Sequence, residues 1–202
     1  MLPEGFVWIR DIIPDILEDI RYAGFHNFMG RPAKGYLAPH AVLSIPAAQS
    51  LKRAADAFAL QHMRLLIYDA YRPQRAVDDF YRWSQNPNDI LTKAEFYPTL
   101  EKPELFQRGY ISLKSSHSRG STVDLTLTDA AGTPLNMGGD FDWFLPISGH
   151  DYALLTPEQK EHRLLLKHGM EAAGFEPYSE EWWHYRLKNE PYPQTYFDFE
   201  IE

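Results

Sequence analysis

The sequence predicts an α+β fold in a single domain over residues 1–202, with a mainly antiparallel central sheet flanked by helices. Three observations lead to this class. Several segments carry apolar residues at helical spacing, others alternate or run apolar as strands do, and the two kinds follow one another without a repeated β-α-β order. A chain of 202 residues is also long enough to bury one substantial hydrophobic core.

Three segments have the pattern of amphipathic helices. Residues 45–63, IPAAQSLKRAADAFALQHM, carry apolar side chains at helical intervals and have a proline near their start. Residues 74–85, QRAVDDFYRWSQ, form a second segment of this kind. Residues 156–175 open with T-x-x-Q, which is typical of a capping box, and reach Gly174, a favourable helix end. We therefore expect a helix in each segment.

Three other segments are expected to be strands. Residues 63–73, MRLLIYDAYRP, have the composition of a buried strand that ends at its proline. Residues 121–127, STVDLTL, alternate apolar and polar side chains, and residues 181–187, EWWHYRL, are aromatic and strand-like. Residues 93–110 are rich in turn formers, and we expect them to run over the surface as an irregular connection.

Composition excludes several classes of function. A net charge of −8 without any basic cluster argues against a nucleic-acid partner, and no apolar run is long enough to span a membrane. Without cysteine, any metal must be held by histidine, aspartate or glutamate. The first residues lack the pattern of a signal peptide, so we expect a cytoplasmic location, or a periplasmic one if a signal peptide has been removed from a longer precursor.

Asp124 is the most unusual residue of the predicted strands. In STVDLTL the alternation puts the valine and both leucines on one face and Asp124 on the other. A carboxylate buried in such a strand is costly unless something pairs with it. Two histidines are candidate partners: His117 lies in the polar turn SSHSRG, and His184 lies in the aromatic stretch EWWHY.

Together, these three residues form a set of two imidazoles and one carboxylate. Each histidine taken alone is more commonly a hydrogen-bonded structural residue. As a set, His117, Asp124 and His184 offer three ligands and an open fourth position, which is the pattern of a catalytic Zn²⁺ site, although other divalent metals accept the same ligands. A bound metal would be the partner that Asp124 needs.

Glu181 could complete a hydrolytic site. It precedes His184 by three residues, so the two face opposite ways on a regular strand, whereas a turn or irregularity would bring both into one cavity. There Glu181 could take a proton from a metal-activated water and pass it to a leaving amine. Glu180 and Glu181 could instead form a solvated acidic pair, and spacing alone does not choose between the two glutamates.

Arg72, in YDAYRPQ, lies at the end of a predicted buried strand. There it could stabilise an oxyanion, or it could be a turn arginine that pairs with Asp69. A serine hydrolase built from Ser116, His117 and Asp124 is a further alternative. Adjacent serine and histidine residues on a short turn make that geometry awkward.

The combined motifs resemble a known family. SxHxxGxxxDL, a later EWWH and an upstream YRP are similar to the motifs of D-alanyl-D-alanine dipeptidases of the VanX type. These zinc D,D-peptidases share a fold with the amino-terminal signalling domain of hedgehog proteins. The resemblance covers essentially the whole chain, and it implies one Zn²⁺ per chain and hydrolysis of D-Ala-D-Ala to two D-alanines. The implied role is in cell-wall peptidoglycan chemistry, in either vancomycin resistance or recycling.

The resemblance also assigns roles to individual residues. It implies that the zinc ligands are His117, Asp124 and His184, that Glu181 is the catalytic base, and that Arg72 stabilises the transition state. It thereby chooses between the two neighbouring glutamates.

Four further residues resemble those that bind the two charged ends of a dipeptide. Ser115 and Tyr36 resemble residues that hold the substrate carboxylate, and Asp142 and Tyr22 resemble residues that receive the substrate ammonium group. A closed site that pairs both charges would reject longer peptides, because burying an unpaired charge is costly. The stretch DWFLPISGHDY after the Asp142 motif is less polar than the resemblance leads us to expect.

Two other functions stay open at this point. One is a D,D- or L,D-carboxypeptidase that acts on peptidoglycan stem peptides, and the other is a non-catalytic, zinc-stabilised binding domain. Glu181 and Arg72 argue against the binding domain, because such a domain needs neither residue. The expected partner is therefore a small molecule, the D-Ala-D-Ala dipeptide.

Overall fold

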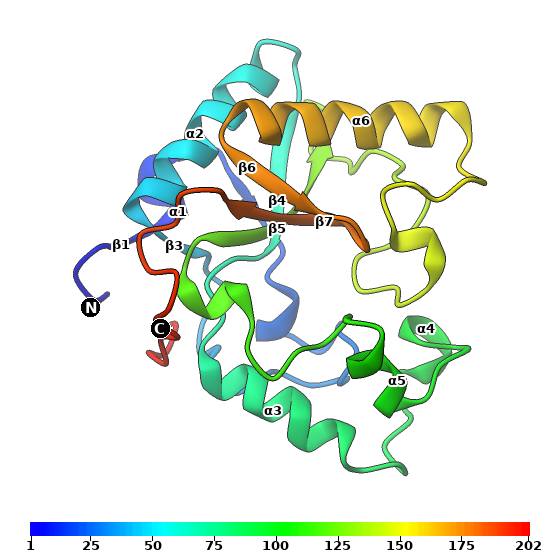
Figure 1. The fold of residues 1–202 in the computed structure, drawn as a ribbon. Helices are drawn as coiled ribbons and strands as arrows, with labels where there is room; N and C mark the ends of the chain where they lie inside the picture. The colour runs from blue at the N-terminus through cyan, green and yellow to red at the C-terminus, as the bar shows by residue number, and fades with distance from the viewer.

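The computed structural model of the chain describes all of residues 1–202, and it has the α+β class expected from the sequence (Figure 1). Its main sheet has five strands, and only the outermost pair β2–β4 is parallel, so the sheet is mainly antiparallel as predicted. In spatial order the strands are β2 (Leu17–Glu18), β4 (Arg64–Asp69), β5 (Thr122–Thr128), β7 (Glu181–Leu187) and β6 (Phe175–Tyr178).

Helices lie on both sides of this sheet (Figure 1). The longest two, α2 (Ile45–Ala59) and α6 (Pro157–Ala172), cover one side and pack closely, because Gly169 leaves room for the ring of Phe58. The other side carries α3 (Gln74–Ser84), α4 (Lys93–Phe96) and α5 (Lys102–Gln107). None of the helices is both long and apolar enough to cross a membrane.

The remaining elements are short. A second sheet pairs β1 (Phe6–Trp8) with β3 (Val42–Ser44), and α1 (Ile9–Ile12) follows β1. The 3-10 helices are η1 (Arg21–Ala23), η2 (Ser116–Arg119) and η3 (Pro146–Ser148). One of them, η2, turns the chain into β5 and so carries one of the candidate metal ligands to the edge of the site.

Most of the predicted elements are present, with shifted ends. The helix expected over residues 45–63 ends at Ala59, and α6 has the predicted capping box between Thr156 and Gln159. The expectation of an irregular connection over residues 93–110 is wrong in part. This segment contains α4 and α5, and α5 is stabilised by its own capping box between Glu101 and Glu104.

Strand β5 lies at the centre of the sheet. All its residues are buried, because α6 covers one face and the cavity described below covers part of the other. Its apolar face belongs to the hydrophobic core, as the alternation predicted, and contributes Val123, Leu125 and Leu127. Asp124 therefore faces a buried site from the middle of the sheet.

Two irregularities in strand pairing shape this site. In β4 the register shifts between Ile67 and Asp69, and this places Asp69 directly opposite Asp124 on β5. In β7 the pairing with β6 is irregular between Glu181 and Tyr185, which is the departure from a regular strand that Glu181 requires. Side chains that a regular strand would separate are thus brought to one face.

Candidate active site and metal centre

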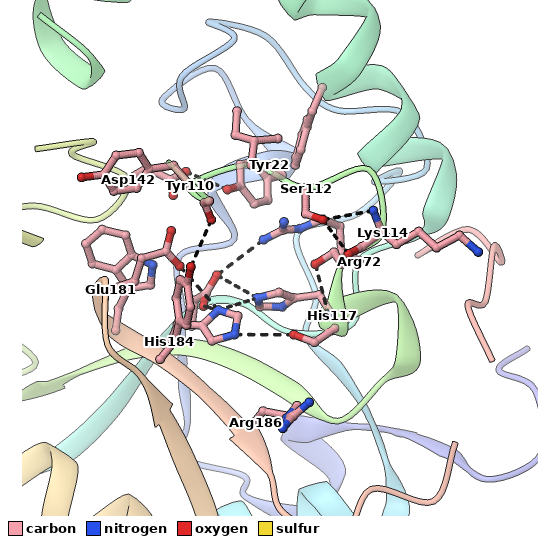
Figure 2. A pocket seen from close by; sticks show the side chains of 18 of the residues that line it. Tyr22, Arg72, Tyr110, Ser112, Lys114, His117, Asp142, Glu181, His184 and Arg186 are labelled. Atoms are coloured by element: carbon pink, nitrogen blue, oxygen red, sulfur yellow. Dashed lines mark hydrogen bonds and ion pairs between the residues drawn. The ribbon is translucent and has the colours of Figure 1, made fainter. Parts of the chain in front are cut away.

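His117, Asp124 and His184 meet at one point, although they come from η2, β5 and β7. His117 Nε2 lies 3.2 Å from Asp124 Oδ2, and His184 Nδ1 lies 3.1 Å from Asp124 Oδ1. The two imidazole nitrogens are 3.3 Å apart. Asp124 and His184 are direct partners across neighbouring strands, so the sheet itself fixes this part of the geometry. Figure 2 shows the two imidazoles turned toward one another.

The protonation of His117 follows from its second contact. Its Nδ1 lies 2.7 Å from the carbonyl oxygen of Ala70, which can only accept a hydrogen bond. Nδ1 therefore donates the proton, and Nε2 presents a lone pair to the centre of the site. Such an outer hydrogen bond is the usual way in which a metal-binding histidine is oriented.

These three residues fit a zinc ion. A tetrahedral Zn²⁺ with bonds of about 2.0 Å has ligand atoms about 3.3 Å apart, which matches the spacing of the three donor atoms. Asp124 Oδ1 is buried and receives no hydrogen bond from any donor in the chain. A cation between these three donor atoms would satisfy all of them.

The surroundings of Asp124 favour the charged form of its carboxyl group. Burial alone would raise its pKa, but the neighbouring imidazoles of His117 and His184 outweigh burial and lower the pKa of this carboxyl well below its usual range. Burial lowers the pKa of His184, which keeps its imidazole neutral. A carboxylate and a neutral imidazole are the forms of these side chains that bind a metal.

Glu181 lies beside this centre. Its Oε2 is 3.6 Å from His184 Nδ1, so the irregularity in β7 does bring both residues to one cavity (Figure 2). Burial, together with the charges of Asp124 and Asp142, raises the pKa of Glu181 well above the usual value. A carboxylate with a raised pKa takes up a proton readily, which is the property that a general base needs near neutral pH.

Arg72 is held between Asp69 and the cavity. Its Nε donates to Asp69 Oδ2 at 2.9 Å, its Nη2 lies 3.5 Å from Asp124 Oδ2, and its guanidinium lies over the ring of Tyr22. Arg72 therefore pairs with Asp69, as one interpretation expected, and it also lines the cavity, which is where the oxyanion role would require it. Asp69 holds one edge of the planar guanidinium, and the N–H groups of the other edge are free to donate hydrogen bonds into the cavity.

Tyr36 contacts Asp69 and is not among the residues that line the cavity. Its hydroxyl donates to Asp69 Oδ1 at 2.6 Å, its side chain is buried, and it does not line the cavity. The expected contact of Tyr36 with the substrate carboxylate stays a prediction. In this structure Tyr36 supports the carboxylate that holds Arg72.

Asp142 and Tyr22 meet at the opposite end of the cavity. The Tyr22 hydroxyl donates to Asp142 Oδ2 at 2.7 Å across 120 residues of sequence, and both side chains are buried (Figure 2). Burial raises the pKa of Asp142 to about 7, against the hydrogen bond from Tyr22, which lowers it. A buried carboxylate with one hydrogen-bond donor has capacity left for a cationic group.

Ser115, the N-cap of η2, and Ser116, the first residue of η2, precede His117. Ser115 Oγ accepts a hydrogen bond from the backbone N–H of His117 at 3.2 Å and also lines the cavity. Ser116 Oγ lies 3.5 Å from His184 Nε2 and has no hydrogen bond with His117. The serine hydrolase alternative, which needs a Ser116–His117 pair, is thereby contradicted.

The cavity that joins these groups has a volume of about 450 Å³. Eight of the nine residues to which the resemblance assigned roles line it: Tyr22, Arg72, Ser115, His117, Asp124, Asp142, Glu181 and His184. At its mouth the Tyr178 hydroxyl donates a long hydrogen bond, 3.5 Å, to the carbonyl oxygen of Gly109. The cavity thus has the candidate metal ligands at one end and a buried carboxylate at the other.

Comparison with known proteins identifies the family. Residues 3–202 match the family described as D-ala-D-ala dipeptidase, Peptidase_M15. The chain belongs to this family. It is 45% identical over 197 residues to the D-alanyl-D-alanine dipeptidase of Streptomyces coelicolor, covering 97% of this chain and 98% of that protein. It is 41% identical over 199 residues to the D-alanyl-D-alanine dipeptidase of Enterococcus faecium, covering 98% of each.

A solved structure gives a more distant similarity. The vancomycin resistance D,D-pentapeptidase VanY, solved as a mutant in complex with Zn(II), has 15% sequence identity and a TM-score of 0.47, covering 76% of this chain and 77% of that one. The family assignment rests on the sequence matches alone. They confirm the resemblance that the motifs indicated, and they make the chain a member of a metallopeptidase family.

Asp69 is a site residue to which the sequence pattern gave no catalytic context. It was expected only as a possible partner of Arg72, and the structure adds contacts with Tyr36 and with His117, whose Nδ1 lies 3.5 Å from Asp69 Oδ2. Burial raises the pKa of Asp69, against the opposing charges of Arg72 and His117. Its position at the end of a buried strand was the only available signal, because the register that sets it opposite Asp124 is not visible in the sequence.

Proposed function

We propose that the protein hydrolyses D-Ala-D-Ala to two D-alanines with one Zn²⁺ per chain, held by His117, Asp124 and His184. The single observation that carries this proposal is the cavity itself. It places these ligands and Glu181 at one end and Asp142 with Tyr22 at the other. The full-length similarity to D-alanyl-D-alanine dipeptidases supports the choice of substrate.

The charged ends of the substrate orient it in this cavity. Asp142, aided by the Tyr22 hydroxyl, receives the ammonium group, since it is the buried carboxylate at that end. Ser115 Oγ is the polar side-chain atom beside His117 that is placed to bind the substrate carboxylate. The peptide bond of a dipeptide bound in this way lies between the two ends, within reach of Glu181 and Arg72.

Glu181 carries out the proton transfers. When bound, Zn²⁺ supplies Lewis-acid chemistry, polarising a carbonyl oxygen and acidifying water. Glu181 takes the proton of the attacking water on its carboxylate and then delivers it to the nitrogen of the leaving D-alanine. Arg72, held by Asp69, points its free donors at the oxygen that becomes negative as the carbonyl carbon turns tetrahedral.

The alternatives are less well supported. A stem-peptide carboxypeptidase binds substrates with an amide in place of the free ammonium group, and such an amide would leave Asp142 buried without a cationic partner. A non-catalytic binding domain has no use for Glu181 and Arg72 in the same cavity as the metal ligands.

Release of D-alanine from D-Ala-D-Ala tests the proposal. We expect activity that is lost with a chelator, restored by Zn²⁺, and reduced by about 10²–10⁴-fold in Glu181→Ala. Glu180→Ala is the matched control, because Glu180 is the exposed neighbour and does not line the cavity. Metal analysis should give one zinc per chain. No release from zinc-loaded protein would refute the proposal, and release from a pentapeptide alone would favour the carboxypeptidase.

A further inference from the structure

One buried arginine ties down the segment that carries Asp142. Arg163, on α6, donates through Nε to the carbonyl oxygen of Met137 at 2.6 Å. Its Nη1 donates to the Gly149 carbonyl and its Nη2 to the Ile147 carbonyl, both at 2.7 Å. The guanidinium thus spans both sides of Asp142 in sequence and fastens this part of the chain to a long helix.

The charge of Arg163 has no carboxylate partner. The residue is 3% exposed, and its partners are three backbone carbonyls and the ring of Trp182, 5.8 Å away. Burial lowers its pKa to about 10. Burying a charge costs free energy. We therefore expect the planar set of guanidinium donors to have a role that an apolar side chain of the same size could not fill.

The segment that Arg163 holds has little regular structure of its own. It lies between β5 and α6, and its only regular structure is the one-turn helix η3 (Pro146–Ser148). Asp142 sits in it with a positive φ of 58°, a conformation that side chains other than glycine rarely adopt. Such a conformation persists only where surrounding contacts over-determine it.

We propose that Arg163 is a positioning residue for the ammonium end of the cavity. Its three hydrogen bonds fix the 137–149 segment so that the Asp142 carboxylate stays on Tyr22 and faces the substrate ammonium group. Arg163 thereby sets the preference for substrates with a free amino terminus. This inference rests on the proposed dipeptidase function.

The substitution Arg163→Lys tests this role, because it keeps the charge and removes the fork. We expect KM for D-Ala-D-Ala to rise about ten-fold, the equivalent of about 1.4 kcal/mol, with kcat changed less than about two-fold. Asp142 binds a group remote from the reacting carbonyl, so loosening it removes binding rather than transition-state stabilisation. The preference for D-Ala-D-Ala over its N-acetylated form should fall by the same factor.

A double-mutant cycle separates positioning from general destabilisation. In an Asp142→Asn background the ammonium partner is already altered, so Arg163→Lys should raise KM less than about two-fold further. Arg53→Lys is the matched control. Arg53 also donates to a distant backbone carbonyl, that of Ala173 at 3.0 Å, but it lies on α2 away from the cavity, and its substitution should leave KM unchanged.

A second variant keeps the test valid if Arg163→Lys does not fold. Ser148→Ala removes another tie in the same segment, the hydrogen bond from Ser148 Oγ to the Trp143 carbonyl, without touching the buried charge. It should raise KM in the same sense, and again only when Asp142 is intact.

Two results would contradict the inference. An unchanged KM in both variants, or the same factor in both backgrounds, would show that Arg163 has no role specific to Asp142. Wild-type protein is assayed beside every variant. Absence of D-alanine release from it would refute the dipeptidase function and this inference together, whereas normal wild-type release with equal factors would refute only the role of Arg163.

Discussion

The metal end of the cavity is built mainly from neighbouring strands, with His117 supplied by η2, whereas the ammonium end is built from irregular segments. Asp124 is paired in register with His184 on one side and with Asp69 on the other, so backbone hydrogen bonds of the sheet set their separations. Asp142 and Tyr22 have no such frame. They come from the segment before α6 and from η1, and one side-chain hydrogen bond joins them.

This difference shows two ways of holding a buried polar group in position. In the sheet, strand register fixes where each side chain lies, so replacing one side chain leaves the others in place. The chemistry of a single ligand can therefore be changed without unfolding the protein. In the irregular segment, position depends on side chains from elsewhere, such as Arg163 reaching over from α6. We therefore expect substitutions at the metal end to change chemistry, and substitutions at the ammonium end to change geometry.

The largest expected effect comes from Asp124→Asn at the metal end. The carboxylate is lost while the side-chain volume and the strand pairing remain, so we expect the zinc content to fall toward zero with an unchanged far-UV circular dichroism spectrum. Without the Lewis acid, several kcal/mol of transition-state stabilisation are lost, and D-alanine release should fall by about 10³-fold or more. Metal analysis after gel filtration and the dipeptide assay measure the two effects.

Asp129→Asn is the control for this prediction, because Asp129 is an exposed aspartate directly after β5 and outside the cavity. It should retain both zinc and activity. A variant Asp124→Asn that kept a full zinc complement would show that the two histidines suffice, and the carboxylate would need another explanation.

The substitution Asp69→Asn tests whether strand register alone fixes the positions of the side chains at the metal end of the cavity. Asp69 is fully buried and pairs with Arg72, with its Oδ2 2.8 Å from Arg72 Nη2, so the substitution leaves a buried guanidinium with a weaker partner. We expect the free energy of unfolding to fall by about 3 kcal/mol, together with a lower kcat. Urea titration at neutral pH measures the change in stability.

Asp56→Asn provides the comparison for that measurement. It breaks an exposed pair with Lys52 on α2 and should change stability by less than about 0.5 kcal/mol. If Asp69→Asn were equally mild, the sheet would be sufficient to place Arg72, and the contrast between the two ends of the cavity would become sharper.

The metal end was also the more predictable end from sequence. Alternation in STVDLTL placed Asp124 opposite the core face, and the spacing of Glu181 and His184 required an irregular strand, which β7 has. Both inferences use only the period of a strand, a local property. The motif SSHSRG likewise placed His117 in a turn, as η2 shows.

Contacts between distant segments were not predictable in the same way. The motifs near Tyr36 matched the family, yet the hydroxyl of Tyr36 lies on Asp69 because of how the chain before β3 packs against β4, which no local pattern encodes. The role of Arg163 was equally hidden. In the sequence it is one charged residue among several on an amphipathic helix, and only the fold shows that its partners are three carbonyls of another segment.

The smallest expected effect is a pH dependence of stability at the ammonium end. His150 adjoins the segment that Arg163 holds, and burial, with the nearby charges of Arg163 and Lys167, lowers its pKa to about 4. In the unfolded chain its pKa is about 6.5, so between these values the unfolded state binds the extra proton. The stability from neutral His150 is present above pH 6.5 and is lost as the pH falls toward 4.

Substituting His150 by glutamine should remove this dependence. Between pH 7.5 and 5 the wild-type protein should lose about 1–2 kcal/mol more in unfolding free energy than His150→Gln does, as measured by urea titration at both pH values. His168→Gln, which replaces an exposed histidine on the same side of the sheet, should lose as much as the wild type. Equal losses in all three proteins would mean that a carboxylate stabilises the protonated form of His150 in the folded state. Asp151 and Glu171 are the carboxylates near enough to act in that way, so the ammonium end would then be less sensitive to acid than its construction implies.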